Sequence, residues 1–100
     1  MNPLQVYNVE IHELCLKHSV GELAVFGSVL TENFNATSDI DLVVDFTRME
    51  RKEYAGNYFN FKKSLEELFQ RKVDLLEKSA LKNPFFLEVL QNTKKIIYAG

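Results

Sequence analysis

Two aspartates that lie two positions apart in an apolar run restrict the fold of this 100-residue chain more than any other feature. Asp39 and Asp41 belong to the sequence Asp-Ile-Asp-Leu-Val-Val, which is typical of a strand. Because side chains alternate between the faces of a strand, the two carboxylates project from one face, with backbones roughly 6.6 Å apart. Carboxylates on one face can share a hard cation such as Mg²⁺, which prefers oxygen ligands.

A Gly-Ser pair lies upstream of these aspartates and offers complementary hydrogen-bond donors. The apolar run from Leu23 to Phe26 leads into Gly27-Ser28. A glycine lets the backbone come close to a phosphate group, and the serine hydroxyl adds a freely rotating donor. Phosphate donors beside metal-binding carboxylates are the parts that phosphoryl or nucleotidyl transfer needs. Each motif also has a plainer interpretation, because Gly-Ser is a common turn and Ser-Asp often begins an element.

The order and spacing of these motifs resemble those of the polymerase-β-like nucleotidyltransferases. Gly27-Ser28, ten intervening residues and Asp39-Ile40-Asp41 are similar to the superfamily signature, and in particular to that of its small stand-alone members, the minimal nucleotidyltransferase (MNT) domains. Leu42 to Phe46 resembles the continuation of the catalytic strand. Residues 58–68 resemble the long helix of the family, and Lys72 to Leu76 resembles the strand that bears its third carboxylate.

This resemblance implies a metal-dependent nucleotidyltransferase that uses ATP or another NTP. It implies that Asp39, Asp41 and Asp74 are catalytic and bind two Mg²⁺ ions, for which Mn²⁺ could substitute. It also implies that Gly27 and Ser28 bind the nucleotide phosphates. From the residues alone, two interpretations of Asp74 stay open. An acid between two apolar residues is costly to bury without a cation, so it is either such a ligand or a solvent-facing residue on an open sheet face.

The resemblance also implies a protein partner. Stand-alone MNT proteins resemble antitoxins that silence a HEPN-type toxin by adenylylating it, which makes a hydroxyl of a partner protein the expected acceptor of AMP. The chain departs from many MNT domains after Gly27-Ser28, where Val29, Leu30 and Thr31 stand in place of arginines. That departure leaves a second function open, a binding module that neutralises its partner by contact. A purely structural subunit would be expected to lose the acids.

Composition narrows the partners and the cellular setting. Twelve basic and fourteen acidic residues give a net charge of −2, and no Lys/Arg run is present, so we expect no long nucleic acid as a partner. No stretch approaches about 18 apolar residues, so we expect no membrane contact and a cytoplasmic protein. The single cysteine, Cys15, excludes an internal disulfide and is expected on a buried helix face. Whether the protein is a homo-oligomer stays open.

Hydrophobic periodicity predicts one α+β domain over residues 1–100, with a small mixed α/β-type sheet of three or four strands and helices packed on it. One sheet face would present Asp39, Asp41 and Asp74. Helices are expected from Asn2-Pro3 to about His18 with Gly21 as the stop, from Tyr54 to Phe69, and from Asn83-Pro84 onward; strands are expected at Glu22 to Phe26, Asp39 to Phe46, Lys72 to Leu76 and Lys95 to Tyr98, and a loop at Thr31 to Ser38.

Three further groups receive plain interpretations. Asp45 shares the parity of Asp41 but lies roughly 13 Å further along the strand, too far to share a metal ion. The aromatic stripe that includes Tyr54 and Tyr58 follows the helix period, so core packing is favoured over base stacking. The two histidines, His12 and His18, are expected at solvent-facing or terminal helix positions, without a catalytic role.

Overall fold

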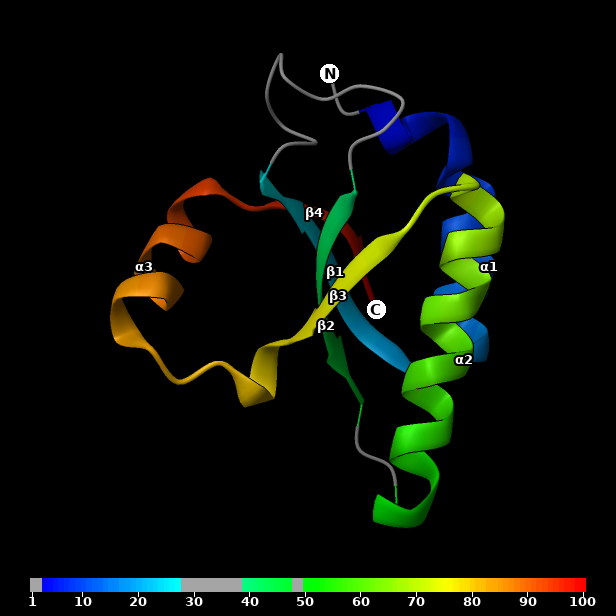
Figure 1. Cartoon of the computed structure of the whole chain (residues 1–100). Helices are drawn as coiled ribbons and strands as arrows, with labels where there is room; N and C mark the ends of the chain where they lie inside the picture. Colours follow the sequence, from blue (N-terminus) through cyan, green and yellow to red (C-terminus); the bar gives the residue numbers. More distant parts are fainter. Residues whose placement is uncertain (1–2, 28–38, 48–49) are drawn as a thin grey trace.

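The computed structural model describes residues 3–27, 39–47 and 50–100 of the chain (Figure 1). In chain order, the elements are the 3-10 helix η1 (Pro3–Tyr7), α1 (Asn8–Lys17), β1 (Val20–Phe26), β2 (Ile40–Phe46), α2 (Arg51–Phe69), β3 (Val73–Glu77), the 3-10 helix η3 (Lys78–Ala80), α3 (Pro84–Thr93) and β4 (Lys95–Ala99). None of the described helices is long and apolar enough to cross a membrane.

The four strands of the described chain form one mixed sheet in the order β3-β2-β1-β4. Strand β1 pairs antiparallel with both β2 and β4, whereas β2 and β3 are parallel. A parallel pair needs a crossover connection, and α2 provides it between β2 and β3. The mixed sheet with its packed helices confirms the predicted α+β fold class, and β4 lies at a sheet edge.

One face of the sheet carries the main hydrophobic core, and α1 and α2 both cover it (Figure 1). Alternate strand residues such as Leu23 and Leu42 point into this core and are fully buried. Phe61 and Leu65 of α2 meet them from the other side, also fully buried. Burial of one such side chain contributes about 1.5–3 kcal/mol, so this layer supplies most of the apolar stabilisation.

The opposite face of the sheet is covered in part by α3, which stands apart from the other helices in Figure 1. Its buried cluster is small and consists of Ala24, Val43 and Leu90, with half-buried apolar neighbours around it. Asp74 belongs to this face and is exposed. The sheet therefore separates a deep apolar core from a face that combines a shallow core with acidic residues.

The N-terminal helix differs from its prediction at its start and agrees with it, to within one residue, at its end near His18. The 3-10 helix η1 precedes α1, which begins only at Asn8, and α1 ends at Lys17. Ser19 then takes a left-handed conformation with φ of 59°. The prediction that Gly21 stops this helix is wrong, because Gly21 lies inside β1. A side chain there would come within 3.2 Å of the carbonyl oxygen of Asp45 on β2, which explains the glycine.

The remaining helices and strands agree with their predicted positions to within three residues. The predicted cap of α3 is confirmed, since the Asn83 side chain accepts hydrogen bonds from the Phe85 and Phe86 amides at 2.9 and 3.2 Å. Core packing of the aromatic stripe is confirmed for the helix as a whole, with Tyr54 edge-on to Phe46. The loop predicted for residues 31–38 lies outside the described residues.

His18 occupies the C-terminal cap of α1, and its side chain is only 6% exposed. Its Nδ1 lies 2.9 Å from the carbonyl oxygen of Leu14, and its ring lies against Phe61. The Asn57 side chain also donates a 2.7 Å hydrogen bond to the carbonyl oxygen of His18. The expectation of a terminal position is therefore correct, and the ring serves the core.

Candidate active site

The sheet brings two of the three predicted acids side by side. Asp41 lies near the start of β2, and Asp74 lies near the start of β3. Parallel pairing sets these two residues directly opposite each other. Neighbouring strands are about 4.8 Å apart, and residues paired in this way point to the same face. Both carboxylates therefore project from the face that α3 partly covers, at the end of the sheet where β2 and β3 begin.

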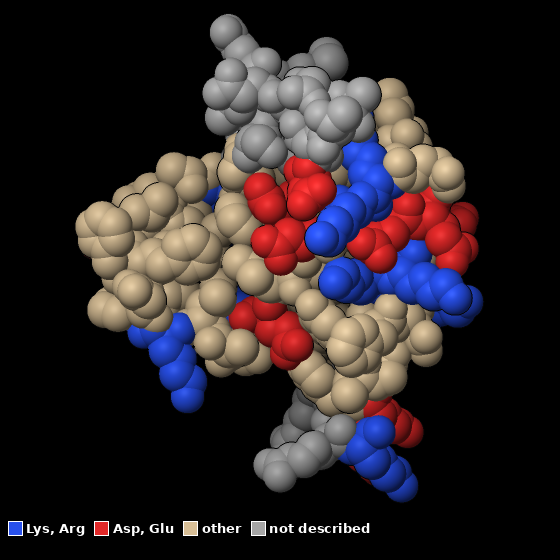
Figure 2. Space-filling model, in the orientation of Figure 1, with Lys and Arg blue, Asp and Glu red and all other residues tan. Residues whose placement is uncertain are grey.

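Asp39 immediately precedes β2 and is exposed. Figure 2 shows Asp and Glu side chains gathered where β2 and β3 begin, with Lys and Arg side chains next to them on the side of α2. A charge arrangement of this kind combines acceptors for a cation with nearby positive groups that could attract an anion. The acids are also accessible to small ligands, because Asp39 and Asp74 are both exposed.

Gly27 packs against Asp41 from the end of β1. Phe26, the last residue of β1, is paired with Asp41, so the chain turns beside this carboxylate. Gly27 has φ of 69°, and a Cβ atom there would overlap the Oδ2 atom of Asp41 and lie 3.2 Å from its Cγ atom. Only glycine fits both conditions without a shift of the neighbouring carboxylate. The structure thus brings Gly27 next to the acids, whereas Ser28 lies outside the described residues.

The donor chemistry of this site fits a hard divalent cation. Asp41 and Asp74 supply carboxylate oxygens from neighbouring strands, and Asp39 can add a third group from the start of β2. Over residues 3–27, 39–47 and 50–100, no three acidic, histidine or cysteine side chains already converge on one point in the manner of a closed metal site. A cation bound between these carboxylates would offset the repulsion between their like charges.

The outer edge of β3 is tied to α2 by two side chains. The Tyr58 hydroxyl donates a 2.6 Å hydrogen bond to the carbonyl oxygen of Leu75. The amide of Val73 donates a 2.9 Å hydrogen bond to Oε2 of Glu66. Sequence reasoning missed both contacts, because Tyr58 was assigned to the apolar stripe and Glu66 was given no role of its own. The available signal was the hydroxyl of a tyrosine on a buried face, which usually finds a partner.

Comparison with known proteins agrees with this geometry. Residues 10–97 match the family described as the nucleotidyltransferase domain. The chain belongs to this nucleotidyltransferase family. A Methanocaldococcus jannaschii protein assigned as a protein adenylyltransferase is 35% identical over 75 residues, which cover 75% of this chain and 74% of the relative. The protein adenylyltransferase MntA of Thermococcus cleftensis is 33% identical over 86 residues, which cover 86% and 81% of the two chains.

Solved structures support the same assignment. A structure described as a minimal nucleotidyltransferase superposes with a TM-score of 0.76 at 26% identity and covers 92% of this chain and 90% of that one. The MNT antitoxin in a complex with the tri-AMPylated HEPN toxin of Shewanella oneidensis shares the fold, with a TM-score of 0.65 at 16% identity over 96% of this chain and 72% of that one. The protein is thus an NTP-dependent nucleotidyltransferase of the minimal type.

Two other acids of the nucleotidyltransferase lie on the same two strands but away from the site. Asp45 is exposed and pairs with Glu22 of β1, further along β2 than Asp41. Glu77 ends β3, where it lies near the hydroxyl of Tyr54 and raises the pKa of that tyrosine, after the larger effect of burial, to about 12. Both acids lie near the ends of β2 and β3, whereas the carboxylate pair lies near the starts of these strands.

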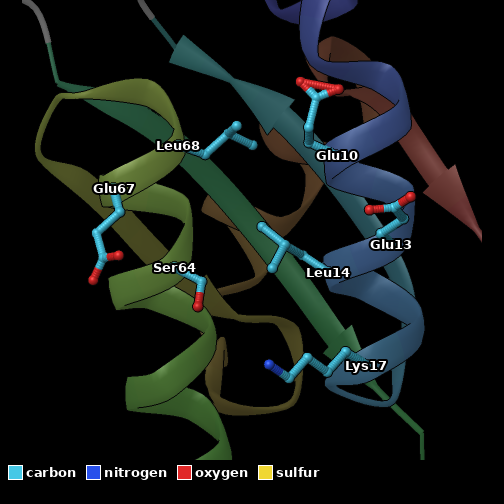
Figure 3. A pocket seen from close by; sticks show the side chains of 7 residues that line it. All are labelled: Glu10, Glu13, Leu14, Lys17, Ser64, Glu67 and Leu68. Atoms are coloured by element: carbon cyan, nitrogen blue, oxygen red, sulfur yellow. The ribbon is translucent and has the colours of Figure 1, made fainter.

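An open hollow of about 540 Å³ lies between α1 and α2 (Figure 3). Leu14 and Leu68 provide its apolar lining, and charged residues of both helices surround it. The hollow belongs to the helical layer, on the opposite side of the sheet from Asp41 and Asp74. It therefore has no direct access to the reacting groups that these acids would serve.

Proposed function

We propose that this nucleotidyltransferase transfers AMP from ATP to a hydroxyl group of a partner protein. The observation that carries the proposal is the paired position of Asp41 and Asp74, with Gly27 packed against the first of these carboxylates. The names of its relatives support an adenylyl donor and a protein acceptor. Carboxylates on sheet strands can be held with the accuracy that such a transfer requires.

In the proposed reaction, the acceptor oxygen forms a bond to the α-phosphorus while the bond from that phosphorus to the leaving pyrophosphate breaks. The proton of the acceptor hydroxyl passes to the Asp74 carboxylate, which is exposed and can meet an incoming macromolecule. Gly27 lets the triphosphate approach the backbone next to Asp41, and Ser28 contributes a hydroxyl donor. The chain thereby orients the nucleotide on one side of the carboxylates and the acceptor on the other.

Asp39 and Asp41 would hold two divalent cations, and Asp74 would complete the ligand set of one of them. When bound, such ions supply electrostatic stabilisation of the attacking oxygen and of the leaving pyrophosphate. Mg²⁺ is the expected ion, and Mn²⁺ is an alternative with the same preference for oxygen ligands. We expect ATP to bind weakly without either ion, because the acids would repel the triphosphate.

The proposed partner is a HEPN-type toxin, and the proposed biological role is that of the antitoxin in a toxin–antitoxin pair in the cytoplasm. The AMPylated toxin in the structure from Shewanella oneidensis motivates this choice of partner. No long nucleic acid is needed in this scheme.

Co-expression with the protein encoded next to its gene, followed by intact-mass spectrometry of that partner, tests the proposal. We expect the partner to carry the mass of one or more AMP groups on Tyr, Ser or Thr. The Asp41→Asn variant should leave the partner unmodified. Asp45→Asn is the matched control, since Asp45 lies on the same strand and face but outside the site, and this variant should modify the partner normally.

The same experiment separates transfer from neutralisation by contact. If the Asp41→Asn protein silences the partner as fully as the wild type, and the wild type adds no mass, the protein is a binding module and the proposal is wrong. Catalysis is supported if the wild type and Asp45→Asn both modify and silence the partner, whereas Asp41→Asn does neither.

A further inference from the structure

Strand β3 lies at the edge of the sheet, so every second residue turns its backbone groups away from β2. The Ile40 amide donates a 3.1 Å hydrogen bond to the carbonyl oxygen of Lys72, which shows that Lys72 faces β2. Because the direction alternates along a strand, Asp74 also directs its backbone groups toward β2, whereas Val73 and Leu75 direct theirs outward. The outward groups on either side of Asp74 are therefore those that face no other strand of the described sheet.

Side chains of α2 bond to one outward group on each of these two residues. Glu66 accepts the hydrogen bond of the Val73 amide at 2.9 Å, and the Tyr58 hydroxyl donates to the Leu75 carbonyl oxygen at 2.6 Å. The carboxylate acceptor makes the first bond charge-assisted, which strengthens it. Burial, together with the charges of Glu77 and Asp74, raises the pKa of Tyr58, so its hydroxyl keeps the proton that it donates. The two bonds bracket Asp74 in the sequence.

We propose that Tyr58 and Glu66 are positioning residues for nucleotidyl transfer, which hold β3 from its outer side so that the Asp74 carboxylate stays opposite Asp41. Asp74 itself is exposed, and β2 alone would fix its strand from one side. The two α2 side chains take the place of a further strand at this edge. They also occupy two of the backbone groups, one on each side of Asp74, through which another strand could add. The inference rests on the proposed function of Asp74.

Tyr58→Phe and Glu66→Ala are the variants that test this inference, each measured in the full chain with its partner. Tyr58→Phe removes only the hydroxyl and keeps the ring, which packs edge-on to Phe59. We expect kcat to fall roughly tenfold for either variant and the Mg²⁺ concentration at half-maximal rate to rise, while KM for the partner protein stays unchanged. A purely structural loss would lower the melting temperature without changing the metal requirement.

A measurement independent of activity follows the same bonds. Amide hydrogen exchange of residues 73–77 should be faster in both variants, by roughly tenfold or more at Val73 when Glu66 is replaced by Ala. Glu66→Gln is the conservative variant, because its amide oxygen can still accept from the Val73 amide. It should restore slow exchange and most of kcat.

Two controls come from the same helix. Glu67→Ala removes the neighbouring carboxylate. Glu67 lines the hollow between α1 and α2 (Figure 3), whose lining residues all come from these two helices. Tyr54→Phe removes a hydroxyl one helical turn before Tyr58. That hydroxyl hydrogen-bonds to the side chains of Glu77 and Ser79, which follow Asp74 in the sequence. Both variants should keep the kcat and the metal requirement of the wild type.

Asp74→Asn separates failure of this inference from failure of the proposed function. If Asp74→Asn is inactive while Tyr58→Phe and Glu66→Ala match the wild type in kcat and metal requirement, the positioning role is wrong and the proposed function stands. If Asp74→Asn retains full activity, the assigned role of Asp74 is wrong and the positioning inference falls with it. A loss of kcat in Tyr58→Phe and Glu66→Ala that Glu66→Gln largely restores supports the inference.

Discussion

The two faces of the sheet divide stability and chemistry between them. The face under α1 and α2 buries a large apolar cluster with fully enclosed side chains such as Phe61 and Leu65. Of the described residues, the face under α3 buries a small cluster of Ala24, Val43 and Leu90, and it carries the Asp41–Asp74 pair at its end. Charged groups that must bind a ligand are costly in a core, so the fold keeps them on the side that contributes less to stability.

The strongest test of this division replaces an acid on the chemical face. Asp41→Asn should lower the rate of transfer by at least about 10³-fold, because a charge that stabilises the transition state is lost. Its free energy of unfolding without metal should stay equal or rise, since repulsion from Asp74 is relieved. Single-turnover kinetics and urea unfolding measure the two effects. A large loss of stability in the metal-free variant would show that Asp41 holds the fold.

A core substitution on the other face should have the reverse signature. Phe61→Ala is expected to lower the free energy of unfolding by about 3 kcal/mol or more, because a fully buried ring leaves a cavity. Leu90→Ala, in the smaller cluster under α3, should cost about 2 kcal/mol, at the lower end for such replacements. Urea unfolding of both variants compares the faces. Equal losses would mean that the α3 face contributes to stability as much as the main core.

The sequence predicted the features of both faces that depend on local pattern. The alternation of side chains along a strand placed Asp41 on the other face of the strand from the core residue Leu42, and helical periodicity located α2. It also predicted the end of the first helix near His18 to within one residue, but it assigned the stop to Gly21, because a left-handed serine at position 19 leaves no composition signal. Side-chain alternation also does not say which strands pair. The neighbouring positions of Asp41 and Asp74 followed only from the resemblance to a family.

Contacts between elements were the part of the site that sequence patterns could not supply. Tyr58 and Glu66 belong to a helix, and their partners belong to a strand that follows it, so the hydrogen bonds depend on how α2 crosses β3. The close approach of Gly27 to Asp41 likewise depends on the pairing of β1 with β2. Glycine beside a motif was a visible signal for this second contact.

Gly27→Ala tests whether the backbone at the end of β1 must stay close to the Asp41 carboxylate on the chemical face. The left-handed backbone and the overlap of a Cβ atom with the Asp41 carboxylate predict a loss of stability of about 1–2 kcal/mol. Displacement of Asp41 should lower the rate of transfer by roughly tenfold or more. Gly56→Ala is the matched control, because a Cβ atom there meets nothing within 4 Å. It should be slightly stabilising, since alanine favours an exposed helix. Equal behaviour of the two variants would contradict the proposed contact.

The smallest expected effect concerns pH and belongs to the core face. Burial raises the pKa of the Cys15 thiol from 9.0 to about 12. A group whose pKa is higher in the folded state contributes stability that is fully present below its unfolded pKa, here 9.0, and that is lost as the pH rises toward about 12. The free energy of unfolding should therefore begin to fall above about pH 9, by up to about 1.4 kcal/mol per pH unit from this thiol. Urea unfolding between about pH 7 and 10 measures the slope.

Cys15→Ala should be less stable than the wild type near pH 7, by about 1 kcal/mol, because it leaves a small cavity. Its free energy of unfolding should then stay level up to about pH 10, where Tyr54, whose pKa burial raises from 10.0 to about 12, begins to contribute. The free energies of unfolding of the wild type and of Cys15→Ala should converge as the pH rises from about 7 to about 10. Parallel curves for Cys15→Ala and the wild type would show that ionisation of other groups, and not of the buried thiol, governs the alkaline limit of the core.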